Sequence, residues 1–448
     1  MNPSVLELCR SGIAAARRFG ATDAEVYGIS ADTTTATIEK HDLLMAKTQR
    51  ETAFGVRALV GNQVGFASTN DVSDLERACR EAALLAKASP GDPSNVLPAS
   101  GPIVPVDGLY DVDAERYTTD RAVREAIGIL EIAEAIDRRI LIGDGEFSFR
   151  RSERAVANTR GVGTDERTSL FLYSVLATAK DGERVSNMDY QFGATRRVDR
   201  IDVEPIVRRA CRNALDSLGA EPCGASFRGS VLLSPQAVES LLVGLILFQV
   251  NARNAVRRQA RWADCLGQRV AAPTLTVVDD GRLPGGVAAS AFDREGSPHA
   301  RLTILEEGKL VSLLHNAYSA TALGQQNTGH AAGSAQSVPA IGPTNLTILP
   351  GSATKDELVS EIRQGLLVTR FSGNVDPVSG DFSGVAKGAQ LISNGRLERA
   401  VTGTLIAGNV FECLETLSGV SREQETIVNL TLPYVRVERV SVTAGTAC

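Results

Sequence analysis

The sequence predicts an α+β protein in which a mixed N-terminal half precedes a β-rich C-terminal half. In the first half, amphipathic helical patterns alternate with strand-like segments. In the second half, short apolar segments are separated by glycine-rich turns. A polar connection at 223–229 separates the two patterns, and 448 residues suffice for about two or three domains of ~150 residues each. We therefore expect one domain at 1–222 and a second at 223–448.

Helices in the first half are indicated by their caps and by their apolar spacing. Ser4 and Glu7 form a capping box at the start of a helix that reaches Phe19, and Gly20 is suited to end it. The same periodicity predicts helices at about 72–88, 114–138 and 202–218. Gly61-Asn62 predicts a hairpin turn. Strands are expected at 24–30, 33–40, 52–60, 63–68, 140–150, 154–158, 168–179 and 184–192.

The second half begins with a short strand at 229–233 and a clear helix start. Ser234 suits the N-cap and Pro235 the first helical position, and the helix should run through Leu247 or as far as Val256. A polar, glycine-rich segment is expected at 316–333. Strands are expected at 274–278, 300–305, 310–314, 344–349 and within 426–444, with a short helix at 354–364.

The stretch 365–414 is the richest in glycine and organises the second half. Asn394-Gly395 predicts a tight hairpin turn. We expect strand, long loop, strand, turn and strand, with the loop at 372–384. The loop carries Asn374, Asp376, Asp381 and Phe382, which suit a cleft. A β-sheet with glycine-rich corners is the alternative.

The composition indicates which binding partners and which cellular compartment to expect. The net charge of −6 argues against nucleic acid or an anionic membrane as the main partner. Seven scattered cysteines without a CxxC pair indicate free thiols in a reducing cytoplasm. The N-terminus lacks a signal-peptide pattern, and the apolar run at 241–248 is too short to span a membrane. We expect a cytoplasmic protein.

The residues alone give no self-sufficient catalytic constellation. The four histidines are His41, His299, His315 and His330, and none belongs to an HExxH motif. Phosphate-loop, dinucleotide and GxSxG patterns are missing as well. Cys413 has no histidine near it in sequence and is expected to be a buried structural thiol.

Taken together, the pieces of the C-terminal half resemble the TldD/PmbA family, and within it the TldE (PmbA) branch. The N-terminal half matches more loosely, best at Arg50-Glu51-Thr52 and Gly55-Val56-Arg57. The matching pieces, in order, are Asp279-Asp280 with Pro284-Gly285-Gly286, Phe292-Asp293-Arg294-Glu295-Gly296, Asn327-Thr328-Gly329, Thr344-Asn345-Leu346, Gly365-Leu366-Leu367-Val368-Thr369, Gly380-Asp381-Phe382-Ser383-Gly384, Asn394-Gly395 and Ile406-Ala407-Gly408-Asn409.

The resemblance implies one half of a cytoplasmic heterodimeric metalloprotease. In that family, the TldD subunit carries an HExxxH helix and a late cysteine as zinc ligands, and the heterodimer encloses a chamber that admits unfolded peptides. In this chain the corresponding helix reads ESLLVGLILFQVN from Glu239, and no cysteine lies near 423–427. Apolar side chains cannot hold zinc or move a proton.

We therefore expect a TldE-like subunit with no catalytic residue, metal ligand or cofactor of its own. Zinc would belong to a TldD-like partner with HExxxH, and the substrate would be an unfolded or modified peptide, processed in peptide maturation, small-protein degradation or a natural-product pathway. The candidates for substrate or partner contact are Asn374, Asp381, Phe382 and Asn409.

Two alternatives remain open at this stage. One is a peptide-binding or chaperone-like homo-oligomer that works without a catalytic partner. The other is a family member recruited for non-peptidase biosynthetic chemistry, with Asp293, Glu295 or Asp381 as acid or base.

Overall fold

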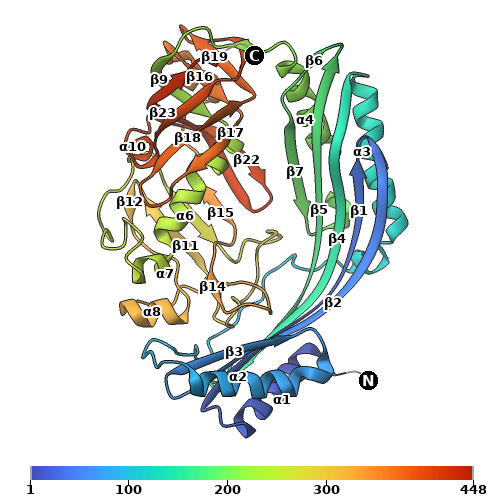
Figure 1. The fold of residues 1–448 in the computed structure, drawn as a ribbon, viewed down its shortest axis with the longest axis vertical. Coiled ribbons are helices and arrows are strands. Elements are labelled where there is room, and N and C mark those ends of the chain that lie inside the picture. The colour runs from blue at the N-terminus through green and yellow to red at the C-terminus, as the bar shows by residue number, and fades with distance from the viewer. Residues whose placement is uncertain (1–2, 446–448) are drawn as a thin grey trace.

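The computed structural model describes residues 3–445 and confirms the α+β prediction. A seven-stranded sheet forms the N-terminal half, and a fourteen-stranded sheet forms most of the C-terminal half. Figure 1 shows the N-terminal sheet as a long curved wall, with the C-terminal half lying along its concave side. No helix of residues 3–445 has the length and apolar character needed to cross a membrane.

The N-terminal sheet is built from long antiparallel strands in the order β3-β2-β1-β4-β5-β6, with β7 also paired to β5. In the central pair, β1 is in register with β4 from Glu25↔Asn158 to Glu39↔Asp144. The strands are β1 (Asp23–Glu39), β2 (Asp42–Val60), β3 (Gln63–Thr69), β4 (Ile140–Asn158), β5 (Gly163–Asp181), β6 (Arg184–Val185) and β7 (Asp189–Thr195).

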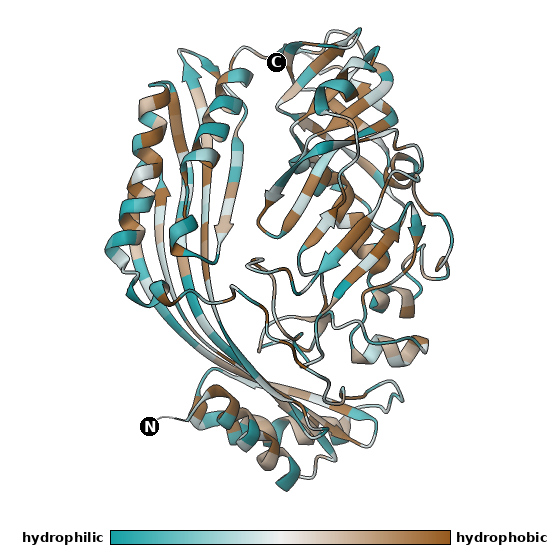
Figure 2. Ribbon diagram, turned by 180° about the vertical axis from the view of Figure 1, so that it is seen from behind, coloured by the Kyte–Doolittle hydropathy of each residue, from teal (hydrophilic) through white to brown (hydrophobic). Residues whose placement is uncertain are grey.

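Two pairs of expected strands, 24–30 with 33–40 and 140–150 with 154–158, are in fact the single strands β1 and β4, in a sheet with one buried and one open face. Along β5, fully buried residues such as Phe171 and Tyr173 alternate with half-exposed Leu170 and Leu172. The buried side faces helices, whereas the other side faces the C-terminal half (Figure 2). Polar residues at 32–33 in β1 and 151–153 in β4 interrupt the apolar pattern without ending the strand.

Helices cover the buried face of this sheet at both of its ends. Helices α1 (Val5–Arg18) and α2 (Leu75–Ala88) pack at one end, and α3 (Thr119–Ile136) and α4 (Glu204–Ser217) pack at the other. The predicted Ser4–Glu7 capping box is confirmed. The helix expected at 114–138 is instead a 3₁₀ turn (Val112–Arg116) followed by α3, because Thr118 caps α3.

The C-terminal sheet follows the order β12-β11-β10-β15-β23-β9-β16-β19-β20-β8, with β17, β18, β21 and β22 joined beside it. Its long strand β23 pairs with β9, β15, β21 and β22. The strands are β8 (Glu221–Pro222), β9 (Phe227–Leu233), β10 (Val277–Asp280), β11 (Arg301–Glu306), β12 (Lys309–Leu310), β15 (Leu346–Ile348), β16 (Gln364–Val368), β17 (Arg370–Val375), β18 (Asp381–Lys387), β19 (Ala389–Ser393), β20 (Arg396–Thr402), β21 (Leu405–Asn409), β22 (Gly419–Ile427) and β23 (Leu430–Thr443).

The helix that begins at Ser234 forms the apolar centre of this half. Ser234 accepts a hydrogen bond from the backbone N–H of Ala237, and Pro235 is the first helical residue, as predicted. The helix runs through α5 (Pro235–Val238), a π-helical turn (Glu239–Val243) and α6 (Gly244–Val250). Further elements are α7 (Ala252–Val256), α8 (Ala317–Leu323), α9 (Lys355–Ser360), α10 (Val410–Glu415) and the small sheet β13 (Ala331–Ala332) with β14 (Ala340–Ile341).

The glycine-rich stretch is more regular than expected. Asn394 and Gly395 both have positive φ, 47° and 76°, so the predicted hairpin turn is confirmed. The predicted long loop at 372–384 is wrong, because most of it pairs as the hairpin β17–β18. Glycine permits this pairing, since Gly373 and Gly384 face each other with their Cα atoms too close for any side chain.

Candidate functional site

One cavity lies between the open face of the N-terminal sheet and loops of the C-terminal half. Its volume is about 360 Å³, within the range of ligand pockets. Tyr27, Arg150, Arg154 and Glu166 come from the sheet. The opposite wall consists of Val287, Ala288, Ala289, Ser290, Asp293, Arg294, His299, Ala331, Ala332, Gly333, Gly342, Pro343 and Thr344.

An arginine on the sheet holds one wall of this cavity. Arg154 on β4 pairs with Glu166 on β5 at 2.7 Å and donates a 2.7 Å hydrogen bond to the carbonyl of Phe292. The hydroxyl of Ser290 donates to Glu166 at 2.6 Å, and Arg154 also contacts Ser290. The sheet and the segment 290–292 are thus joined by charge-assisted hydrogen bonds.

A second arginine holds the neighbouring wall without a carboxylate. Arg196 follows β7 and donates to the carbonyls of Gly286, Val287 and Ala289, at 2.7, 2.7 and 3.0 Å. It also donates to two carbonyls of its own half. Burial lowers the pKa of Arg196 to about 10. The cavity therefore has in its wall a fully hydrogen-bonded guanidinium that is cationic at physiological pH.

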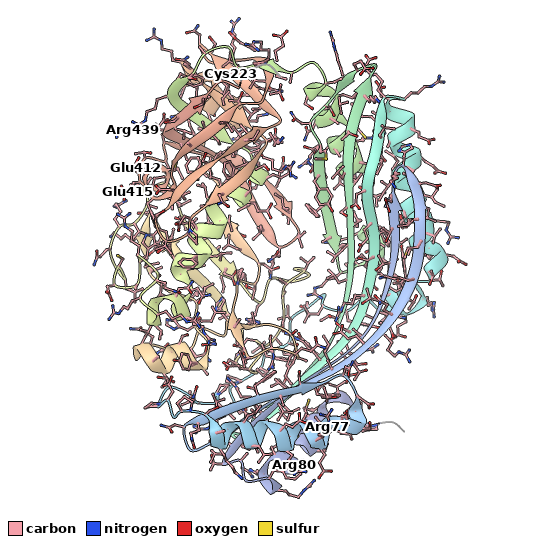
Figure 3. The ribbon with its side chains drawn as sticks, in the orientation of Figure 1. Arg77, Arg80, Cys223, Glu412, Glu415 and Arg439 are labelled. Atoms are coloured by element: carbon pink, nitrogen blue, oxygen red, sulfur yellow. The ribbon has the colours of Figure 1, made fainter. Side chains whose placement is uncertain are left out.

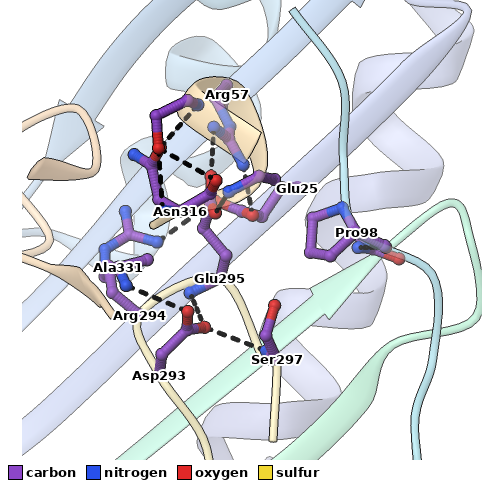
Figure 4. Close-up of polar contacts among 12 residues, drawn as sticks. Glu25, Arg57, Pro98, Asp293, Arg294, Glu295, Ser297, Asn316 and Ala331 are labelled. Atoms are coloured by element: carbon purple, nitrogen blue, oxygen red, sulfur yellow. Dashed lines mark hydrogen bonds and ion pairs between the residues drawn. The ribbon is translucent and has the colours of Figure 1, made fainter. Parts of the chain in front are cut away.

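Next to the cavity, which Arg294 also lines, a buried ion cluster links the two halves (Figure 4). Glu25 accepts from Arg57 at 2.7 Å and from Arg294 at 3.1 Å. Arg57 also pairs with Glu295 at 2.6 Å, and Glu295 accepts from the backbone N–H of Ala317 at 2.9 Å. The side chains of Glu25 and Glu295 are fully buried. Removal of one partner would leave an uncompensated charge in a medium that solvates it poorly.

Asp293 and His299 line the same cavity with shifted pKa values. Asp293 accepts backbone N–H bonds from Glu295, Ser297 and Ala331, while burial and the nearby Glu295 charge raise its pKa well above the usual value of an aspartate. Burial, followed by the positive charges of Arg154 and His330, lowers the pKa of His299 to about 3. His299 is therefore neutral at physiological pH.

A second network of hydrogen-bonded side chains lies next to His299. The Nε2 atom of His330 is 3.1 Å from Asp279, and its Nδ1 atom is 2.9 Å from the hydroxyl of Thr328. Asp279 also accepts from the backbone N–H and the hydroxyl of Thr344. Four of the family-like pieces of the sequence thus converge on one region. Asp279 bonds directly to Thr344 and, through His330, to Thr328, which fits a role in holding the loops.

The sheet residues of this site were not identifiable from the sequence. Glu25, Arg154 and Arg196 reach partners more than 80 residues away, so no local spacing marks them. Only Arg57 lay in a piece that was singled out, Gly55-Val56-Arg57. Asp293 and Glu295 were named as candidate carboxylates, and the structure places both here, whereas Asp381 is exposed on β18.

The predicted contact residues lie together on the β17–β18 hairpin and its neighbour β21. The side-chain amide of Asn409 donates to Asp381 and to the carbonyl of Ser379, both at 2.9 Å, and its oxygen caps α10. Phe382 is buried against Phe371, with ring centroids 5.7 Å apart. Asn374 is exposed opposite Ser383. Among the four, Asn374 and Asp381 have exposed side chains, so they remain the accessible candidates.

The α5–α6 helix, which corresponds to the predicted HExxxH position, is packed in the core. Val238, Leu242 and Val243 are at most 3% exposed. Among residues 3–445, no three His, Cys, Asp or Glu side chains are grouped so as to hold a metal ion. Burial raises the pKa of the Cys413 thiol to about 12, although Glu412 and Glu415 beside it point to solvent (Figure 3).

Comparisons with known proteins identify related sequences and a related fold. Family models match at 24–86 (PmbA/TldA metallopeptidase domain 1), 114–218 (central domain) and 226–444 (C-terminal domain). A metalloprotease from Methanothermobacter thermautotrophicus is 25% identical, covering 89% of this chain and 88% of the relative. Metalloprotease PmbA from Escherichia coli O157:H7 is 26% identical, covering 84% and 82%. The crystal structure of TldE from Thermococcus kodakarensis has a TM-score of 0.88 at 23% identity, covering 97% of this chain and all of that one.

Proposed function

The chain belongs to the PmbA/TldA metallopeptidase family, and on that premise we propose that it is the TldE-like subunit of a heterodimeric zinc metalloprotease. Its partner would be a TldD-like chain that carries HExxxH and the zinc ion. The pair would cleave unfolded or modified peptides in the cytoplasm. This chain would have no peptidase activity of its own.

The observation that carries this proposal is the environment of the α5–α6 helix. A peptidase helix must direct imidazole and carboxylate side chains toward a metal and a substrate. Here the helix that corresponds to it carries Leu241, Leu242, Val243 and Leu245, which are packed into the C-terminal core. Glu239 on the same helix is half-buried, and burial raises its pKa, but no histidine lies within the helix.

The open face of the N-terminal sheet supports a role in holding peptide. Half-exposed Leu170, Leu172 and Leu176 of β5 point away from the covering helices, toward the C-terminal half. An unfolded peptide has exposed apolar side chains and free backbone groups. The open face of the sheet can accept the apolar side chains. Strand β7, paired only with β5 among the strands of residues 3–445, offers an edge for backbone hydrogen bonds.

Co-expression tests the proposal directly. Together with a chain that carries HExxxH, this chain should form a stable complex that cleaves peptide and loses activity with a chelator, whereas this chain alone should be inactive. A matched control is the complex in which the first histidine of the partner's HExxxH is replaced by alanine. Recovery of only separate chains would contradict the proposal.

A partner-independent peptide-binding role is the second candidate, and the same half-exposed leucines favour it. The source genome distinguishes the two proposals. The heterodimer requires a gene for a paralogue with HExxxH, whereas the partner-independent role does not. Recruitment of Asp293 or Glu295 for acid–base chemistry is less well supported, because backbone N–H groups and Arg57 occupy these carboxylates.

A further inference from the structure

We propose that a groove between α4 and the C-terminal half binds an acidic segment of the peptide substrate; this rests on the proposed function only in taking a peptide as the substrate. The groove lies apart from the cavity described above and has a volume of about 480 Å³. Residues of β7 and α4 line one side, and residues of the C-terminal half, among them Lys355, Glu425 and Tyr434, line the other.

One side of the groove is a basic face of α4. Arg208 and Arg212 are four residues apart, and Arg209 and Arg212 are three apart, so their side chains emerge on neighbouring rows of one helix surface. The opposite face of α4 is buried through Val207, Ala210, Cys211 and Ala214, which fixes the orientation of the helix. The arginines are therefore presented to the groove by a rigid element.

Two of the groove's four cations have no ionic partner among residues 3–445. Arg208 pairs with Glu204 at 2.6 Å, and Arg209 pairs with Glu425 across the two halves. Within residues 3–445, no carboxylate lies within 4.0 Å of the charged nitrogens of Arg212 or Lys355. Arg212 is exposed, and its planar guanidinium can donate two parallel hydrogen bonds to one carboxylate.

The sign of the groove is opposite to that of the whole chain. Four cationic side chains line it against the carboxylates of Asp216 and Glu425, but Arg209 is paired with Glu425 and Arg208 with Glu204, so the positive excess comes from Arg212 and Lys355. The chain as a whole carries a net charge of −6. A local positive groove on an acidic protein attracts a short acidic ligand, whereas a long polyanion such as nucleic acid would be repelled by the rest of the surface.

The remaining groups of the groove suit a peptide. The ammonium of Lys355 lies 5.2 Å from the ring centroid of Tyr434, which holds the cation in place over an aromatic floor. Gln390 and Thr369 add amide and hydroxyl groups on the C-terminal side. Gln191 belongs to β7, so the groove adjoins the edge strand at which a peptide could pair.

Binding of a labelled peptide to the purified chain tests this site. The probe is a twelve-residue peptide with six glutamates, and its reference is the same peptide with glutamine at those positions. Fluorescence anisotropy measures the dissociation constant at low and at physiological salt. The glutamate peptide should bind more tightly than the glutamine peptide, and added salt should reduce the difference.

Substitutions locate the binding. Arg212→Gln should weaken binding of the glutamate peptide about threefold, and Arg212→Gln with Lys355→Gln about tenfold, as expected for the loss of one or two exposed ion pairs. The control is Arg80→Gln with Arg439→Gln, which changes the net charge by the same amount. Both arginines are exposed, Arg80 at the far end and Arg439 on the outer side of the molecule (Figure 3). This control should change binding less than twofold.

Three results would overturn the site. Equal binding of the two peptides would remove the electrostatic basis, and equal loss in the Arg212/Lys355 and Arg80/Arg439 variants would show a general charge effect. If the Arg212/Lys355 variant no longer formed the complex with the HExxxH chain but still bound the glutamate peptide, the groove would be a contact between subunits and not a peptide site. Failure of the complex to cleave peptide refutes the proposed function alone, since the binding measurement needs no partner.

Discussion

Among the polar features of the fold, the buried ion cluster should cost the most stability when one of its residues is substituted, and Glu25→Gln tests this. Glu25 is fully buried and accepts from both Arg57 and Arg294. The cluster of two arginines and two glutamates is neutral, so the substitution leaves one buried positive charge in excess. Breaking a buried ion pair by removal of one partner costs about 3–5 kcal/mol. We expect Glu25→Gln to lower the free energy of unfolding by that amount.

The assay is guanidinium-induced unfolding, with Glu76→Gln as the control. Glu76 pairs with Arg18 at 2.8 Å, the same chemistry at a similar distance, but both side chains are more than 60% exposed. An exposed pair contributes at most about 1 kcal/mol. Equal shifts of the two variants would refute the argument that burial makes the cluster critical.

Other predictions address the fold and its pH dependence. Asn409→Ala should lower stability by about 1 kcal/mol in thermal unfolding, because Asn409 caps α10; loss of peptide binding without loss of stability would assign it to substrate instead. Gly65→Ala should lower the free energy of unfolding by roughly 1–3 kcal/mol, since the added Cβ would lie 2.1 Å from the carbonyl oxygen of Ala82. Gly128→Ala in α3 should raise it by roughly 0.5–1 kcal/mol, because no atom lies within 4 Å of the added Cβ. Burial and the nearby His330 lower the pKa of His315 to about 4, so the unfolded chain takes up a proton below pH ~6.5 that the folded chain does not. Stability should therefore fall as the pH drops from 7 to 5, by on the order of 2 kcal/mol from this residue, and His315→Gln should flatten that dependence in chemical denaturation.

Local signals in the sequence were sufficient for much of the fold. The Ser4–Glu7 box, the Ser234-Pro235 helix start and the Asn394-Gly395 turn each depend on hydrogen bonds between near neighbours, and the structure contains all three. The length of β1 and β4 was underestimated, because a sheet with one open face tolerates polar residues in mid-strand. Helix α8 was missed because its capping Asn316 lies in a stretch rich in glycine and polar residues.

The site was predictable only in part, for a related reason. Asp293 and Glu295 belong to a compact motif and could be named. Arg57, which pairs with Glu295, and Arg154, which donates to the carbonyl of Phe292, come from the other half of the chain, and only the folded sheet brings them near. Phe382 was chosen for its place among polar loop residues, yet the pairing of β17 with β18 turns it into the core.

The central claim is that this chain depends on a partner for its metal and its chemistry. Metal analysis of the purified chain, alone and in complex with an HExxxH chain, tests it most directly when combined with a peptide-cleavage assay. The account predicts less than one-tenth of an equivalent of zinc and no cleavage for the chain alone, and one zinc per heterodimer with cleavage for the complex. One equivalent of zinc on this chain by itself, together with peptide turnover, would contradict it.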